Sequence, residues 1–194
     1  MDSRVLIPRP ETELLAELAI TALQERPGQG ALDLCCGSGC LGITLALSCP
    51  AEAVQAADIS TDALAVTAKN ADALQASIHL HQGDLFAPLT GLRFGVIVSN
   101  PPYIPADVCK TLQAEVLQEP SMALNGGTDG LSFYRRIAAE APAHLFPGGK
   151  LLLEVGWDQG QAVAALLRQA GFCDVAVHKD FQDIERMVVG VWQA

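Results

Sequence analysis

The chain has 194 residues, half of them hydrophobic, which is enough apolar material for one domain that folds without disulfides or metals. Its 22 acidic residues outnumber its 12 basic ones, and the net charge of -10 argues against a partner held mainly through phosphates. No apolar run reaches the roughly 18 residues that span a bilayer and the N-terminus has no signal-peptide layout, so we expect a cytoplasmic protein.

Periodicity predicts strands that alternate with helices. We expect strands over 31–36, 51–60, 77–84, 93–100, 150–156, 171–180 and 185–192. We expect helices over 39–49, 62–74, 131–145 and 159–170, with Ser60 or Thr61 capping the second and a PGG turn after the third. A long connection rich in proline and glycine occupies 101–130. This order predicts an α/β fold with a doubly wound, mostly parallel seven-stranded sheet and a C-terminal antiparallel hairpin.

Polar side chains gather where the predicted strands end. Asp33 stands before the glycine turn that follows the first strand, and Asp58, Asp84 and Asn100 follow the next three strands. Doubly wound sheets bind ligands at the carboxyl ends of their strands. We therefore expect these side chains to form one site.

The turn over 37–42, GSGCLG, fits the pattern G-x-G-x-x-G, and Asp58 lies 21 residues after its first glycine. A dinucleotide oxidoreductase is one interpretation. Asp33 would repel the pyrophosphate of a dinucleotide, whereas the ribose and α-ammonium of S-adenosylmethionine suit a carboxylate, which favours a methyl donor. As alternatives, Asp33 is only a buried acid tied to backbone amides and Asp58 only caps a helix. Residues 84–86 either flank an adenine or form a plain loop.

The fourth strand ends in Asn100-Pro101-Pro102-Tyr103. Prolines lack the N–H group, so these two could simply end the strand. They also leave their carbonyls free, and a proline carbonyl together with the Asn100 oxygen can orient a planar nitrogen that is a poor nucleophile, with Tyr103 as a stacking wall. The pattern is typical of methylation of a planar nitrogen, and the acidic charge favours a glutamine amide over the exocyclic amine of a nucleobase.

Six segments of the chain resemble the release-factor glutamine methyltransferases of HemK/PrmC type: 5–13, 33–39, 57–60, 99–105, 119–134 and 148–156. This resemblance implies a class I methyltransferase (Rossmann-like) fold and S-adenosylmethionine as the donor. It implies as substrate the glutamine of the Gly-Gly-Gln motif in class 1 peptide chain release factors, methylated on its side-chain amide nitrogen, N5. Two alternatives remain, a ribosomal-protein glutamine methyltransferase and a nucleic-acid amino-methyltransferase.

The resemblance also implies site residues. The donor would contact Asp33, Cys35, Cys36, Gly37, Ser38, Gly39, Asp58, Asp84, Leu85 and Asn100. Asn100, Pro101, Pro102 and Tyr103 would hold the glutamine, with Asn100, Pro101 and Tyr103 as catalytic residues. The segment PRPETE, 8–13, either starts a helix or roofs the site over the methionine end of the donor.

Other expectations concern the chain as a whole. Members of this family usually carry a helical N-terminal domain, and we expect the catalytic domain alone over 1–194. Release factors are the expected partners, with no membrane and no direct nucleic-acid binding. His79 and His81 lack a third ligand, so we expect no metal, and the six cysteines are expected to be reduced.

Overall fold

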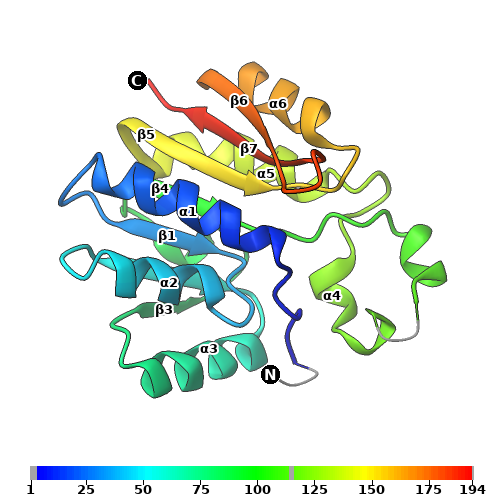
Figure 1. Ribbon diagram of the computed structural model, residues 1–194, viewed down its shortest axis with the longest axis horizontal. Helices are drawn as coiled ribbons and strands as arrows, with labels where there is room; N and C mark the ends of the chain where they lie inside the picture. The colour runs from blue at the N-terminus through cyan, green and yellow to red at the C-terminus, as the bar shows by residue number, and fades with distance from the viewer. Residues whose placement is uncertain (1–3, 114–115, 194) are drawn as a thin grey trace.

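The computed structural model describes residues 4–113 and 116–193. Its centre is a seven-stranded sheet in the order β3-β2-β1-β4-β5-β7-β6 (Figure 1). The strands are β1 Ala31–Leu34, β2 Val54–Asp58, β3 His79–Gln82, β4 Phe94–Ser99, β5 Leu145–Glu154, β6 Cys173–Lys179 and β7 Glu185–Val191. The first five pair in parallel, and β7 runs antiparallel to both β5 and β6. The predicted fold, including the closing hairpin, is confirmed.

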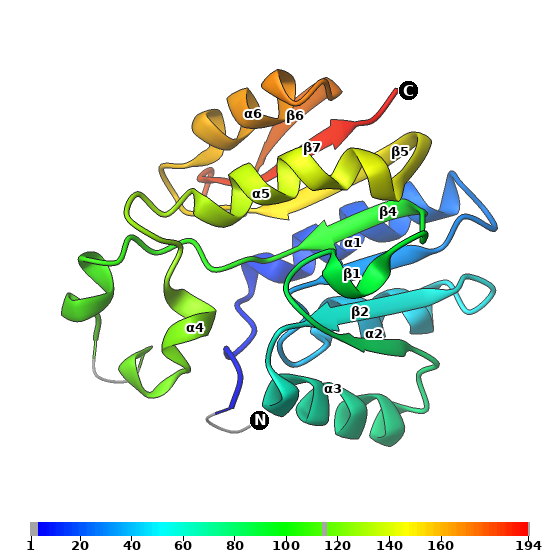
Figure 2. The same cartoon turned by 180° about the vertical axis from the view of Figure 1, so that it is seen from behind.

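Helices cover both faces of this sheet (Figures 1 and 2). One face carries α1 Glu11–Gln24, α2 Cys40–Ser48 and α3 Thr61–Leu74, and the other carries α5 Ser132–Glu140 and α6 Gly160–Gln169. Successive residues of a strand point to opposite faces. Val96 and Val98 of β4 accordingly pack in the core under α1 and α2, and Ile97 packs in the core under α5 and α6.

The ends of α3 and α2 follow from their sequences. The Ser60 side chain caps α3 by accepting a hydrogen bond from the Ala63 amide at 3.2 Å, as expected. Gly39 precedes α2 with a φ of 79°, a left-handed conformation that favours glycine. Both ends lie at the carboxyl edge of the sheet, where the predicted ligand site also falls.

Three parts of the fold differ from the prediction. The PGG sequence lies within β5, because that strand begins at Leu145 and pairs with β4 across a register shift between Phe94 and Val96. The preceding helix ends at Glu140 and continues as a 3₁₀ turn over Ala141–His144, where Pro142 lacks the N–H group for a further helical bond. Helix α1 begins within PRPETE, as one of its two interpretations had it, but it runs on to Gln24, which no predicted helix covered.

The connection 101–130 contains short structured pieces. It holds 3₁₀ turns at Val108–Thr111 and Val116–Gln118 and the short helix α4, Ser121–Leu124, while its residues 114–115 lie outside the described part. The segment before α1 runs between α4 and the carboxyl edge of the sheet in both views (Figures 1 and 2). None of the helices described is long and apolar enough to cross a membrane.

Candidate active site

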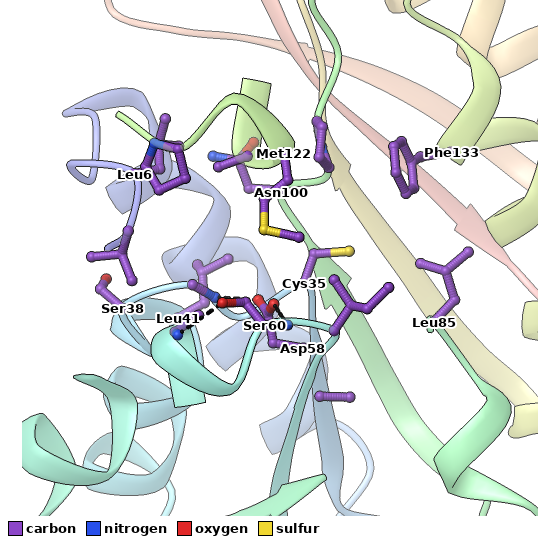
Figure 3. A pocket seen from close by; sticks show the side chains of 18 of the residues that line it. Leu6, Cys35, Ser38, Leu41, Asp58, Ser60, Leu85, Asn100, Met122 and Phe133 are labelled. Carbon is purple, nitrogen blue, oxygen red and sulfur yellow. Dashed lines mark hydrogen bonds between the residues drawn. The ribbon is translucent and has the colours of Figure 1, made fainter. Parts of the chain in front are cut away.

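A cavity of about 320 Å³ lies at the carboxyl ends of β1, β2 and β4 (Figure 3). We call it the large cavity. Predicted site residues that line it are Cys35, Gly37, Ser38, Asp58, Asp84, Leu85, Asn100 and Pro102. Residues of the segment before α1, such as Leu6, and of the loop after β4, such as Met122, complete its wall. The strand ends therefore meet in one place, as the sequence predicted.

Contacts with Asp58 and with helix α3 fix the conformation of the glycine turn after β1. One carboxylate oxygen of Asp58 accepts from the Gly37 amide and the other from the Ser60 amide, both at 2.9 Å. Thr67 of α3 donates to the Gly37 carbonyl at 2.9 Å. A Cβ atom on Gly39 would stand only 2.5 Å from the Thr67 methyl group. The close approach of α3 therefore requires glycine at position 39.

Asp33 lies behind this turn and does not line the large cavity. Its carboxylate is buried and accepts a hydrogen bond from the Gly42 amide of α2 at 2.8 Å. Burial raises the pKa of Asp33 to about 7, the Gly42 bond opposes this rise, and the charge of Asp58 adds to it. The other oxygen, Oδ1, has no hydrogen-bond partner within the described chain. This is the arrangement of the buried-acid alternative, and contact of Asp33 with the donor stays a prediction.

Two further predicted residues of the turn also stand behind the cavity lining. Cys36 is buried with its sulfur 3.6 Å from the Thr67 hydroxyl, and Gly39 forms the start of α2. Cys35, just before the glycine turn, lines the large cavity and has a φ of 62°, and Cys40 of α2 lines the cavity as well. Burial and nearby acids raise the pKa of the Cys35 and Cys36 thiols. These cysteines are therefore uncharged packing groups around neutral pH.

The three candidate residues of the loop after β3 lie in two different places, the large cavity and the core. Asp84 and Leu85 line the large cavity, and Asp84 pairs with Arg136 of α5 at 2.8 Å. Phe86 instead stacks on His144 at a ring separation of 4.7 Å, within the core. Arg136 also lines the cavity and was missed by the sequence reasoning, because its partner stands 52 residues earlier in the chain.

A second, small cavity of about 40 Å³ adjoins the first. Its lining includes Pro101, Tyr103 and Arg9. Pro101 and Tyr103 are the two residues of the predicted acceptor motif N-P-P-Y that do not line the large cavity. Leu6, Asn100 and Ala123 line both cavities, and we call these three the shared wall. Asn100 therefore stands between a large and a small compartment.

Asn100 has a buried oxygen, Oδ1, without a hydrogen-bond partner in the described residues. Such an oxygen costs free energy unless a ligand or water satisfies it. Beside it, the Tyr103 carbonyl is engaged by the Gln159 side chain at 3.0 Å, and burial raises the pKa of the Tyr103 phenol. An unpaired acceptor on a residue that lines both cavities is therefore a candidate contact for a donor group of a ligand.

The PRPETE segment matches both of its interpretations. Its last three residues lie in the first turn of α1, where Glu11 and Glu13 favour the helix dipole. Pro8 and Thr12 line the large cavity, and Arg9 lines the small one. The segment is therefore both a helix start and part of the site. Its expected contact with the methionine end of a donor stays a prediction.

Glu154, at the end of β5, is a residue that sequence reasoning missed. It is 3% exposed and accepts a hydrogen bond from the Thr12 hydroxyl at 2.7 Å. Burial raises the pKa of Glu154, and hydrogen bonds from Thr12 and Asn100 oppose that rise. The sequence does hold a signal for it: Glu154 ends the apolar strand segment KLLLE. A carboxylate at such a buried position is rarely found without hydrogen-bonding or charged partners, so it indicates a site.

The cysteine and histidine side chains form no metal centre in the part of the chain that the structure describes. Within 4–113 and 116–193, no group of three or more His, Cys, Asp and Glu side chains is placed to hold a metal ion. The six cysteines are free thiols. His81 contacts Gln55 on the neighbouring strand at 2.6 Å.

Comparison with known proteins gives consistent matches. The family model described as "Methyltransferase small domain" matches residues 12–129. A release factor glutamine methyltransferase of Bordetella pertussis is 46% identical over 187 residues, which are 96% of this chain and 69% of the relative. One of Geobacter sulfurreducens is 44% identical, over 96% of this chain and 65% of the relative. The chain thus spans about two thirds of the length of these curated relatives.

Among solved structures, a release-factor-specific protein-(glutamine-N5) methyltransferase from Alicyclobacillus acidocaldarius is similar to this chain. The two share 33% sequence identity with a TM-score of 0.61, and the match covers 97% of this chain and 95% of the other. The fold is that of the class I methyltransferases.

Proposed function

The chain belongs to the release factor glutamine methyltransferase family, and from that premise we propose that it methylates the side-chain amide nitrogen, N5, of a glutamine. The methyl donor is S-adenosylmethionine, and the acceptor is the glutamine of the Gly-Gly-Gln motif in class 1 peptide chain release factors. The observation that carries this proposal is that Asn100 lines both cavities and has a buried oxygen, Oδ1, without a hydrogen-bond partner in the described residues.

The large cavity suits the methyl donor, which supplies an electrophilic methyl group on a sulfonium. Its volume falls in the range of about 300–1,000 Å³ usual for small-molecule pockets. Both oxygens of Asp58 already accept one backbone bond each, and a carboxylate has lone pairs left for ribose hydroxyls. Cys35, Gly37 and Ser38 would border the donor on the turn side, and Leu85 with Asp84 would border its adenine.

The small cavity suits the glutamine amide. An amide nitrogen is a poor nucleophile because its lone pair is conjugated with the carbonyl. The Asn100 oxygen and the Pro101 carbonyl would accept its N–H groups, which fixes its orientation and stabilises the positive charge that develops on the nitrogen. Tyr103 would bound the planar group on one side. We propose Asn100, Pro101 and Tyr103 as the catalytic residues on this basis.

Two features favour a protein amide over a nucleobase as the acceptor. The small cavity, about 40 Å³, leaves little room for the ring system of a base beside the shared wall. The net charge of -10 disfavours the phosphates that a flipped base would bring with it. A release factor as partner belongs to the same proposal, while the cytoplasmic location and the single catalytic domain over 1–194 stay predictions.

Transfer of label from S-adenosylmethionine tests the acceptor. The protein would be incubated with labelled donor and, separately, with a release factor, the same factor carrying alanine for the glutamine of Gly-Gly-Gln, a ribosomal protein, tRNA and DNA. We expect label on the unaltered release factor and none on its alanine variant. Label on nucleic acid alone would reverse the proposal.

Calorimetric titration tests the donor without any acceptor. We expect S-adenosylmethionine to bind and NAD not to bind. Tight binding of NAD without binding of S-adenosylmethionine would show that the glycine turn serves a dinucleotide instead.

A further inference from the structure

We propose that Glu154 is a positioning residue that orients the side-chain amide of Asn100, and that Thr12 holds Glu154 in place for this task. The inference deepens the proposed function and rests on it for the identity of the acceptor. It also gives the PRPETE segment a role that neither of its two interpretations contains.

The pairing of β4 with β5 brings Asn100 and Glu154 together. Ser99 pairs with Leu153 in parallel register, so the next residue of each strand, Asn100 and Glu154, follows at the same edge of the sheet. The Asn100 amide lies beside the Glu154 carboxylate and favours its ionised form, while its own oxygen, Oδ1, is buried without a partner in the described chain. Because its oxygen is unpaired, the amide has its NH₂ group left to meet the Glu154 carboxylate.

Helix α1 holds the carboxylate from the opposite side. The Thr12 hydroxyl, on a residue that is 5% exposed, donates to Oε2 of Glu154 at 2.7 Å. The Tyr134 hydroxyl of α5 donates to the Glu154 main-chain carbonyl at 2.8 Å, which fixes the backbone at the same position. Elements from both faces of the sheet thus converge on Glu154.

The chemistry of these groups explains why an acid is useful here. The oxygen and nitrogen of an asparagine amide have nearly the same shape, so packing alone does not select one orientation. An ionised carboxylate only accepts hydrogen bonds, and it therefore selects the orientation with the NH₂ group toward Glu154. The Asn100 oxygen then faces the acceptor, whose N–H groups need an acceptor and would be repelled by an NH₂ group.

The charge of Glu154 also strengthens that oxygen as an acceptor. Hydrogen bonds in a chain polarise one another, so donation from the Asn100 NH₂ group to a carboxylate increases the electron density on Oδ1. The charged groups around Glu154 are Glu11 of α1 and Arg186 of β7, and the titratable groups beside it are Tyr103, Tyr134 and Cys40. Arg186 favours the ionised form of Glu154, and Glu11 opposes it.

Kinetics of single and double variants test the coupling. We expect Glu154→Gln, which keeps the shape and removes the charge, to lower kcat roughly 10-fold or more while KM and the Kd of S-adenosylmethionine change by less than about 3-fold. In the Asn100→Ala background the same substitution should change kcat by less than about 2-fold, because its target is gone. An equal loss in both backgrounds would overturn the inference.

A matched control uses the other buried glutamate near the site. Glu119 is 8% exposed and binds Arg9 rather than Asn100. The effect of Glu119→Gln on kcat should be the same with and without Asn100→Ala. This comparison separates orientation of Asn100 from a general loss of structure, which a parallel thermal melt of each variant also measures.

A measurement on the donor-free and acceptor-free protein separates this inference from the proposed function. The side-chain NH₂ resonances of Asn100, identified by their loss in Asn100→Ala, should move with pH as Glu154 titrates. They should be displaced and independent of that titration in Glu154→Gln, and displaced less in Thr12→Val. Resonances that are the same in the wild type and Glu154→Gln would overturn the positioning role. A clear displacement in a protein that leaves release factors unlabelled would support the role and contradict only the acceptor.

Discussion

Arg9 and Glu119 stand 110 residues apart in the chain and form an ion pair, with Nη2 of Arg9 at 2.9 Å and 3.0 Å from the two carboxylate oxygens of Glu119. The Glu119 side chain is 6% exposed and that of Arg9 is 34% exposed. The pair ties the segment before α1 to the loop after β4, and Arg9 itself lines the small cavity. These two segments form much of the cover of the proposed acceptor site.

Breaking this pair should loosen that cover. We expect Glu119→Gln to lower the free energy of unfolding by about 1–2 kcal/mol, because a partly buried charge-assisted bond is lost while Arg9 stays partly solvated. The matched control is Asp183→Asn, which breaks the exposed pair with Lys179 at 2.9 Å and should cost less than about 0.5 kcal/mol. Urea unfolding measures both, and equal midpoints for the two variants would contradict the prediction.

Replacing Asn100 should affect turnover far more than donor binding. We expect Asn100→Ala to lower kcat by about 10²-fold, since orientation and charge stabilisation are lost on the acceptor side. The Kd of S-adenosylmethionine, measured by calorimetry, should stay within a few-fold. Unchanged turnover would remove Asn100 from the mechanism.

Replacing Asp58 should have the opposite pattern. We expect Asp58→Ala to weaken S-adenosylmethionine by roughly 1–3 kcal/mol through lost hydrogen bonds, with some loss of stability because the Gly37 and Ser60 amides lose their acceptor. Asp62→Ala, on the exposed first turn of α3, is the control and should bind the donor like the wild type. Calorimetry compares them, and equal donor affinities would show that Asp58 serves only the turn.

Gly28 and Gly39 have nearly the same φ angle, so alanine substitutions at the two positions distinguish the cost of backbone strain from the cost of steric crowding. Gly39 has a φ of 79°, and a Cβ atom there would stand 2.5 Å from the Thr67 methyl group, whereas Gly28 has a φ of 80° with nothing within 4 Å. Gly28→Ala should cost about 1–2 kcal/mol from its backbone angle alone. Gly39→Ala should cost about 1–3 kcal/mol more, because the turn must move away from α3. Equal unfolding free energies would mean that Thr67 gives way without cost.

Asp33 should make stability depend on pH. Its pKa in the folded protein is about 7, above the unfolded value of about 3.9, so the folded state binds the proton more tightly. Its contribution to stability is therefore complete below about pH 4 and is lost as the pH rises to about 7. Asp33→Asn removes this loss. Relative to the wild type, the unfolding free energy of the variant should therefore rise by a few kcal/mol between about pH 4 and pH 7. Parallel curves of unfolding free energy against pH would contradict it.

Local signals explain most of what the sequence predicted. The cap at Ser60, the glycine turn and the strand-end acids Asp58 and Asp84 are patterns of short range and lie where they were expected, whereas Asp33 lies behind the turn. The PGG sequence was misread because a turn signal is also short-range, and pairing with β4 across a register shift overrides it. Tertiary pairing decides such cases, and one sequence does not reveal it.

The missed parts of the candidate site are contacts between distant segments. Glu154 meets Thr12 across 142 residues, Arg136 meets Asp84 across 52, and Arg9 meets Glu119 across 110. Composition and periodicity contain no information on which charged side chains meet over such distances. Asp33 was ambiguous for a similar reason, because only the placement of α2 shows that its carboxylate faces the Gly42 amide.

The shared wall has a consequence for the order in which ligands act. Leu6, Asn100 and Ala123 border both cavities, so an occupant of either cavity restricts the side chains that bound the other. Thermodynamic linkage makes such an influence mutual, since any factor by which one ligand changes the affinity of a second must also apply in reverse. The two substrates should therefore change each other's affinity by the same factor, through side chains that border both cavities.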